Sequence, residues 1–268
     1  MLYYKLEGET MKQYLRNFLK YAPLTLNLIK RDLVLKYRRS VLGFAWSILN
    51  PLLMMLVITA VFQNIFKNSI ENYPIYYLTG YILFTFMTGS TNLAMTSVVN
   101  SSSLIKKAYI PKYIFPLEKA LFSFVNMLLS FIAVIIVMLI LRVQFFPTFF
   151  LFWVPMLYTL VFVIGLGLFL AATTVFFRDI IHLYGIVTVA WTYLTPIFYP
   201  VERLPEFMHI VLSFNPLYHY ILYMRALVLY GHVPDLRSNM VCIGYSLIML
   251  AIGVFTFKKT QDKFILYL

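Results

Sequence analysis

The chain has 268 residues, of which 62% are hydrophobic, 18% aromatic and only 12% charged, and 22 Lys and Arg against 10 Asp and Glu give a net charge of +12. A soluble globular protein carries about 25% charged residues, and one soluble core could not bury this much apolar surface, so the composition excludes a soluble fold and indicates an integral membrane protein. No soluble domain is available to present the basic excess to nucleic acid, and we interpret that excess as the mark of the cytoplasmic face.

Windows without Asp, Glu, Lys or Arg predict the membrane spans, because a charged side chain at mid-bilayer costs roughly 2.5 to 3.5 kcal/mol on the insertion scale. Windows of 20 residues or more are long enough to cross about 30 Å of hydrocarbon. Six such windows occur, at 40–66, 72–105, 120–141, 143–177, 180–201 and 238–257. We therefore predict an all-α integral membrane protein of six transmembrane helices.

A seventh charge-free window, 207–224, is divided by Asn215-Pro216 and contains His209, Ser213 and His219. Each half is too short to cross the bilayer, and proline cannot continue a helix. This pattern predicts a re-entrant external hairpin between spans five and six.

Orientation follows from the basic residues. With the N-terminus inside and six spans, 17 of the 22 Lys and Arg residues fall on inner segments and five on outer ones. We expect both termini to be cytoplasmic, with a cytoplasmic segment at 1–39, a single membrane domain at 40–257 and a cytoplasmic tail at 258–268.

The segment 26–40 has Leu26, Ile29, Leu33 and Tyr37 at helical spacing, and basic residues cover much of its remaining surface. This pattern predicts an amphipathic helix on the inner leaflet, with its bases against anionic headgroups. The pattern alone leaves open whether the helix is a plain anchor or a mechanical element.

Several motifs resemble one known family. The stretch from Arg31 to Leu52, which contains RD and then KYRRSVLGFAWSILNPL, resembles the entry to the first span in permease subunits of the ABC-2 polysaccharide and polyol-phosphate export family. Three further stretches match that family in the same order: LIKKAYIP at 104–111, FRDI at 177–180 and TPIFYP at 195–200. The Asn215-Pro216-Leu217 turn is similar to the external gate region of the family, and the resemblance covers nearly the whole chain.

The resemblance implies a half-transporter that pairs with a second copy of itself and with two cytoplasmic ABC ATPase subunits. Its cargo would be a lipid-linked polysaccharide of the wall teichoic acid, O-antigen or capsule type, carried across the bacterial cytoplasmic membrane. The chain would be no enzyme and would bind no cofactor, metal or nucleic acid, with ATP and Mg held by the partner. The sequence agrees, because these residues contain no G-x-x-x-x-G-K-[ST] phosphate loop.

The inner loop 100–119 has a polar start, two lysines and two prolines. By itself this pattern fits an ordinary positive-inside loop, whereas the resemblance favours a helix that couples to the ATPase. The residues that the resemblance implies in coupling are Arg31, Asp32, Arg38, Arg39, Leu104, Lys106, Lys107 and Tyr109. Arg178-Asp179 is expected to form a local ion pair at a tight cytoplasmic turn, with a contact to the ATPase as the alternative.

Aromatic residues collect in the predicted outer region. We expect a translocation path and external gate formed by Phe198, Tyr199, Phe214, Asn215, Pro216, Tyr218, Tyr220 and Tyr223. Aromatic faces stack on sugar rings, but tyrosine is also common at the headgroup level of membranes, so both interpretations stay open for each ring. The histidines and acids on this side lack the short spacing of a metal site.

Two other classes of protein, an ion-coupled transporter and a membrane enzyme, fit the sequence less well. An ion-coupled secondary transporter would place Asp, Glu or His within its spans, and the predicted windows contain only His182. A membrane enzyme acting on polyprenyl-linked glycans would need convergent carboxylates, and the inner acids Asp32, Glu118 and Asp179 are far apart in the sequence.

Overall fold

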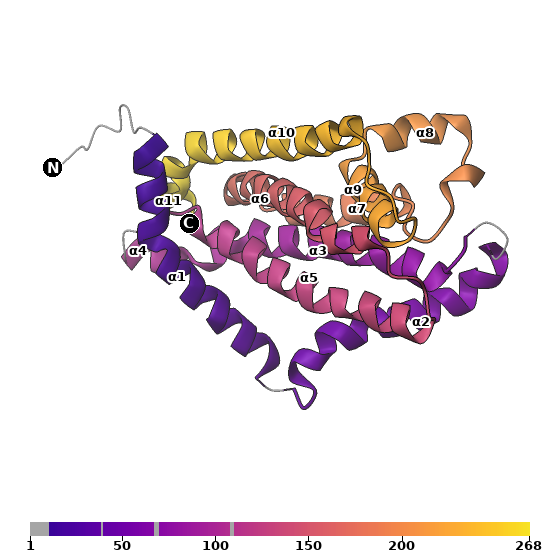
Figure 1. Ribbon diagram of the computed structural model, residues 1–268. Coiled ribbons are helices and arrows are strands. Elements are labelled where there is room, and N and C mark those ends of the chain that lie inside the picture. The colour runs from indigo at the N-terminus through magenta and orange to yellow at the C-terminus, as the bar shows by residue number, and fades with distance from the viewer. Residues whose placement is uncertain (1–10, 39, 67–69, 108–109) are drawn as a thin grey trace.

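The computed structural model describes residues 11–38, 40–66, 70–107 and 110–268, and no residue in these ranges lies in a β-strand (Figure 1). The α-helices are α1 Met11–Tyr37, α2 Trp46–Phe66, α3 Tyr73–Asn100, α4 Ser102–Lys107, α5 Ile114–Ile140, α6 Trp153–Phe176, α7 Ile180–Tyr193, α8 Glu206–Ser213, α9 Pro216–Val228, α10 Leu236–Thr260 and α11 Phe264–Tyr267. Short 3-10 helices lie at η1 Gly43–Ala45, η2 Pro147–Leu151, η3 Val201–Arg203 and η4 Gln261–Lys263.

The described residues contain five helical stretches long and apolar enough to cross a membrane: Gly43–Gln63, Tyr73–Lys107, Ile114–Ile140, Pro147–Phe176 and Leu236–Tyr267. They confirm an all-helical, multi-pass architecture. The fifth predicted span, at 180–201, is not confirmed, because α7 has 14 residues and is therefore only about 21 Å long. The charge-free window extended to residue 201, but Pro196 disfavours helix at the preceding residue and α7 ends at Tyr193.

Two other predicted spans also differ from the helices of the structure in where they begin. The third predicted span was placed at 120–141, but α5 begins at Ile114 and takes Glu118 and Lys119 into its first turns. The fourth was placed at 143–177, but α6 begins only at Trp153, after the η2 turn that starts at Pro147. The segment 26–40 belongs mostly to the longer helix α1.

Helices α3 and α6 form the buried centre of the bundle, with α5 and α10 packed against them. Helix α1 lies across α5, whereas α2 and α10 leave most of their apolar surface exposed. In Figure 1, α4, α11 and the C-terminus gather at one end of the molecule, and α8 and α9 lie at the other. We call these the inner and outer ends.

Helices α6 and α10 make the most extensive helix pair of the described chain. Two glycines permit their close approach, because a Cβ atom at Gly253 would overlap the backbone of Gly165, and one at Gly165 would overlap the backbone of Met249. Small residues at such a crossing let two backbones pack closely, which is a main source of helix association in lipid.

We expect Gly253→Ala to lower the stability of the detergent-solubilised protein by about 1–3 kcal/mol, because the added methyl group forces α10 away from α6. The matched control is Gly244→Ala on the same helix, where a Cβ atom meets nothing within 4 Å; alanine's helix propensity should leave stability unchanged or slightly higher. Thermal unfolding followed by tryptophan fluorescence measures both. Equal effects of the two substitutions would show that the close crossing contributes nothing.

Candidate functional site

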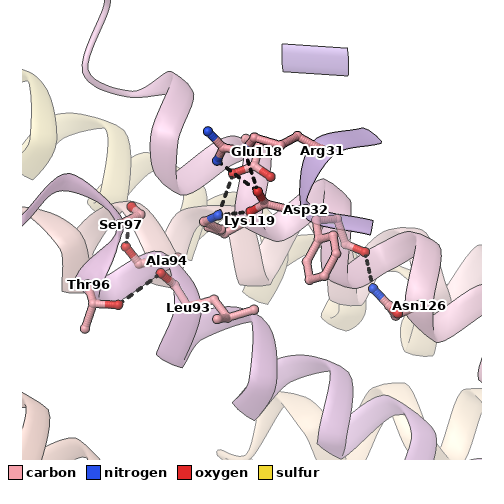
Figure 2. Close-up of polar contacts among 10 residues, drawn as sticks. Arg31, Asp32, Leu93, Ala94, Thr96, Ser97, Glu118, Lys119 and Asn126 are labelled. Atoms are coloured by element: carbon pink, nitrogen blue, oxygen red, sulfur yellow. Dashed lines mark hydrogen bonds and ion pairs between the residues drawn. The ribbon is translucent and has the colours of Figure 1, made fainter. Parts of the chain in front are cut away.

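At the inner end, four charged side chains join α1 to α5, as Figure 2 shows. Arg31 Nη2 lies 2.8 Å from Asp32 Oδ1 on α1. Lys119 on α5 forms an ion pair with Asp32 and a second one with Glu118 Oε2, at 3.1 Å. We call Arg31, Asp32, Glu118 and Lys119 the inner charge cluster.

Lys119 is the centre of this cluster because it is shared by two carboxylates. Burial opposes ionisation of Asp32, but hydrogen bonds from Lys119 and Arg31 outweigh it and hold the pKa of Asp32 below its usual range. Glu118 is almost completely buried, and its Oε1 has no hydrogen-bond partner among the described atoms. The ammonium group of Lys119 therefore ties α1 to α5, and loss of it would leave two acids poorly compensated.

A second tie lies further along α1. Lys36 Nζ and Tyr37 Oη both donate to Asn126 Oδ1 on α5, over 2.9 and 2.7 Å. The hydroxyl group of Tyr37 also bonds that of Ser47 at the start of α2. Helix α1, the elbow into α2 and helix α5 are thus connected by polar contacts, of which that of Lys36 is exposed and those of Tyr37 are buried or half-buried.

The residues proposed for ATPase coupling lie in two groups. Arg31 and Asp32 belong to the inner charge cluster, and Arg38 is exposed at the end of α1. Leu104, Lys106 and Lys107 are exposed on α4, whereas Ile105 between them is buried and anchors this short helix. Arg39 and Tyr109 lie outside the described residues.

The expected ion pair of Arg178 with Asp179 is wrong. No such pair forms in the described chain, and the Asp179 side chain does not bond the first turn of α7. Both side chains are exposed, where water solvates each charge and little is gained by pairing.

At the outer end, Asn215 joins α7 to α9. Its Oδ1 accepts from the backbone N–H of Leu217, which caps α9, and from Trp191 Nε1 at 2.9 Å. Its Nδ2 donates to Thr195 Oγ1 and to the Leu194 carbonyl, over 2.9 and 3.3 Å. One buried amide therefore fixes the angle between the end of α7 and the start of α9, with Pro216 as the first residue of α9.

The turn after α7 is held by tyrosines of α3. Tyr73 Oη donates to the Phe198 carbonyl at 2.7 Å, and Tyr76 Oη donates to the Tyr199 carbonyl at 2.9 Å. The ring of Phe198 lies 5.6 Å from that of Phe62 on α2. These contacts hold the backbone of this turn against α3 and the ring of Phe198 beside α2, whereas the Tyr199 hydroxyl donates to the Tyr193 carbonyl at the end of α7.

The remaining predicted path residues divide by exposure. Phe214 is 75% exposed and Tyr218 is half-buried, so both are open at the outer end. Tyr220 and Tyr223 are buried and bond Ser246 and Asn239 of α10, over 2.7 and 2.9 Å. Their rings hold α9 against α10 and face no open surface in this structure.

Arg225 is one of the five bases expected on outer segments, and the structure buries it within the outer end. It lies on α9 with only 1% of its surface exposed, and its guanidinium stacks 3.4 Å from the ring centroid of Tyr76. Its Nη2 donates to the carbonyls of Pro196, Ile197 and Tyr76, over 2.8, 3.2 and 3.2 Å. Its Nε and Nη1 have no hydrogen-bond partner among the described atoms.

The signal for Arg225 was present in the sequence, since this base interrupts the apolar run ILYMRALVLY. An ionised side chain in such a run needs local acceptors, and three backbone carbonyls supply them here. Arg225 thus holds the turn after α7 against α3.

The described residues contain no group of three or more His, Cys, Asp or Glu side chains that could hold a metal ion. His182 is exposed in the first turn of α7.

The long apolar helices and the polar ties at both ends define a multi-pass α-helical membrane protein without a described catalytic centre. The family model described as "ABC-2 type transporter" matches residues 23–229. The chain belongs to the ABC-2 type transporter family.

Two relatives extend this assignment along the chain. The chain is 27% identical over 260 residues to an O-antigen export system permease protein of Myxococcus xanthus, covering 95% of this chain and 98% of the relative. It is 26% identical over 242 residues to a protein of the same name from Klebsiella pneumoniae, covering 88% and 92%.

We expect Asp32→Asn to lower stability by about 1–3 kcal/mol at pH 7, because it removes a carboxylate held by two charge-assisted hydrogen bonds. A carboxyl group with a depressed folded-state pKa stabilises above its unfolded value of about 3.9, and this contribution is lost as the pH falls through the lower, folded value. The difference from the wild type should therefore be complete at pH 5 to 7 and shrink only below about pH 4.

Thermal unfolding at several pH values measures this effect. Asp179→Asn is the control, because Asp179 is exposed and caps α7 without a side-chain hydrogen bond; it should change stability by less than about 0.5 kcal/mol. A stability difference for Asp32→Asn that disappears between pH 7 and 5 would contradict the depressed pKa.

Proposed function

We propose that this chain is the permease subunit of an ATP-driven exporter that moves a lipid-linked polysaccharide outward across the bacterial cytoplasmic membrane. The observation that carries the proposal is the family match over 23–229, together with similarity to O-antigen export permeases over almost their full length. An O-antigen-type glycan is the first candidate for the cargo, and wall teichoic acid and capsule-type glycans share its lipid-linked chemistry.

In this proposal the inner end faces the cytoplasm, with both termini on that side. The arrangement of α4, α11 and the C-terminus at one end supports it, because many of the bases lie there. Helix α7 and the turn up to residue 200 would form the fifth of six crossings, and α8 and α9 the re-entrant hairpin between it and α10. The burial of α9 against α3, α6 and α10 supports an inserted position for this hairpin.

Two kinds of protein partner belong to the proposal. A separate pair of ATPase subunits would supply ATP hydrolysis, since these residues contain no phosphate loop. A second copy of the chain would complete the path. Helices α2 and α7 expose long apolar faces next to the outer turn, and these faces are available for such a copy.

Coupling would run through two elements. The exposed residues Leu104, Lys106 and Lys107 of α4 are the proposed ATPase contact, joined by Tyr109 in the same loop. Arg31, Asp32, Arg38 and Arg39 would transmit movement through α1. The inner charge cluster supports this route, because a displacement of α1 pulls on α5 through Lys119.

At the outer end, Phe198, Tyr199, Phe214 and Tyr218 would form the surface along which sugar rings slide. Asn215 and Pro216 would set the angle of the gate. Tyr220 and Tyr223 would support the gate, because their hydrogen bonds hold α9 against α10.

An ion-coupled secondary transporter is the alternative, and no observation favours it. Helix α5 does carry Glu118, but this acid lies in the first turns of the helix and is paired with Lys119. A carrier of protons or sodium would need a titratable group exposed to a central pathway.

Transport assays in inverted membrane vesicles test the proposal. We expect glycan uptake with ATP only when the chain is present with its ATPase subunits, and no uptake with an ion gradient and this chain alone. Transport by the chain alone under an ion gradient would overturn the exporter assignment.

We expect the double substitution Lys106→Glu and Lys107→Glu to reduce ATP-dependent export strongly, because it reverses the charge of the exposed α4 surface. Membrane insertion should persist, since neither side chain is buried. Lys263→Glu is the control, because this exposed lysine lies at the same end of the molecule outside α4. Normal export by the double variant would remove α4 from the coupling route.

A further inference from the structure

A groove with a mixed polar and apolar lining lies between α1, α2, α3 and α5, next to the contact between Lys36 and Asn126 described above. It consists of two adjoining cavities of about 170 and 290 Å³. Both cavities are lined by Lys36, Ile82, Thr85, Asn126 and Ser130. We call this space the Lys36 groove.

Lys36 has no acidic partner among the residues that the structure describes. No carboxylate of the described chain forms an ion pair with Lys36, because Asp32 and Glu118 are taken by Arg31 and Lys119. Its ammonium group donates to the neutral Asn126 amide and lies 5.1 and 5.7 Å from the ring centroids of Tyr37 and Phe122. Three N–H donors are present on this group, so further donors remain for an anion.

Two other polar side chains of the groove, those of Ser90 and Asn126, support the binding of an anion beside Lys36. Ser90 is completely buried in the wall of the smaller cavity, and its hydroxyl group has no hydrogen-bond partner among the described atoms. Asn126 is held in one orientation because its Nδ2 donates to the Phe122 carbonyl at 2.8 Å, which leaves Oδ1 to hold the ammonium group of Lys36. Lys36 and this unused hydroxyl donor both line the smaller cavity.

The position of the groove indicates the kind of molecule that reaches it. Asn126 lies eight residues beyond Glu118 on α5 (Figure 2), which is about 12 Å deeper along the helix axis. Trp46 lines the larger cavity and is 45% exposed, and the α2 surface that follows it is apolar and open. An anion at this depth is reached most readily if it is attached to a hydrocarbon chain.

We propose that the Lys36 groove binds the phosphate group of an anionic membrane amphiphile, with Lys36 Nζ as the charge and Ser90 as a hydrogen-bond donor. A compact ammonium group is a common partner of phosphate. Two sources share this chemistry: the diphosphate of a lipid-linked glycan, which rests on the proposed function, and the phosphodiester of a bulk anionic phospholipid.

Binding of farnesyl diphosphate to the purified full-length protein in neutral detergent tests the proposal, with farnesol as the probe without phosphate. We expect saturable binding of farnesyl diphosphate that weakens roughly tenfold in Lys36→Met, because a charge-assisted hydrogen bond is lost. Asn126→Asp should weaken it similarly, because the new carboxylate neutralises Lys36 and repels phosphate. Lys36→Arg should keep the affinity within a few fold, and Lys30→Gln, an exposed lysine of the same helix, should not change it.

Equal affinity for farnesyl diphosphate in all folded variants, or equal binding of farnesol, would overturn the phosphate site. Dioleoyl phosphatidylglycerol separates the two sources: displacement of farnesyl diphosphate at equal concentration assigns the groove to bulk lipid, and displacement only in large excess assigns it to the diphosphate. The assay needs neither ATP nor transport. Its failure therefore leaves the exporter assignment in place, and a failure of export leaves the groove in place.

Discussion

Polar groups among apolar helices must find partners within the protein, because hydrocarbon supplies none. The described chain meets this requirement at a few points that determine how its helices are joined. Lys119 serves two carboxylates from α1 and α5, and Asn215 satisfies groups of both α7 and α9. Arg225 takes three backbone carbonyls from α3 and from the turn after α7. In each case one side chain fixes the relation between segments that lie far apart in the sequence.

The two ends of the bundle use different chemistry for these joints. At the inner end the cluster around Lys119 is ionic, and Lys119 and Asp32 are partly exposed whereas Glu118 is buried. At the outer end the ties are amide, tyrosine and backbone contacts around α9, which are directional and neutral apart from Arg225.

Between the inner and outer ends, the helices are held together mainly by close packing of their surfaces. The crossing of α6 and α10 depends on glycine, and α3 lies buried beside it, so this part of the bundle is rigid. Helices α2 and α7 lie outside it and expose apolar side chains such as Leu56 and Ile186. The Lys36 groove lies between α1, α2, α3 and α5, beside the exposed helix α2.

The sequence by itself determined the class of protein and most of its helices. A charge in hydrocarbon is costly, so each membrane span must be an apolar segment of a minimum length. This cost depends on the residues of the segment itself, so it can be recognised in the sequence. The sequence also located the break at Asn215, since proline acts on its own neighbours. It overestimated α7 because a charge-free window does not mark a helix end. Only the tertiary structure brought Asp32 and Glu118, separated by more than eighty residues, together around Lys119 and buried Arg225 beneath Tyr76. Such pairings depend on which helix faces meet, and the charges of single residues do not specify those faces.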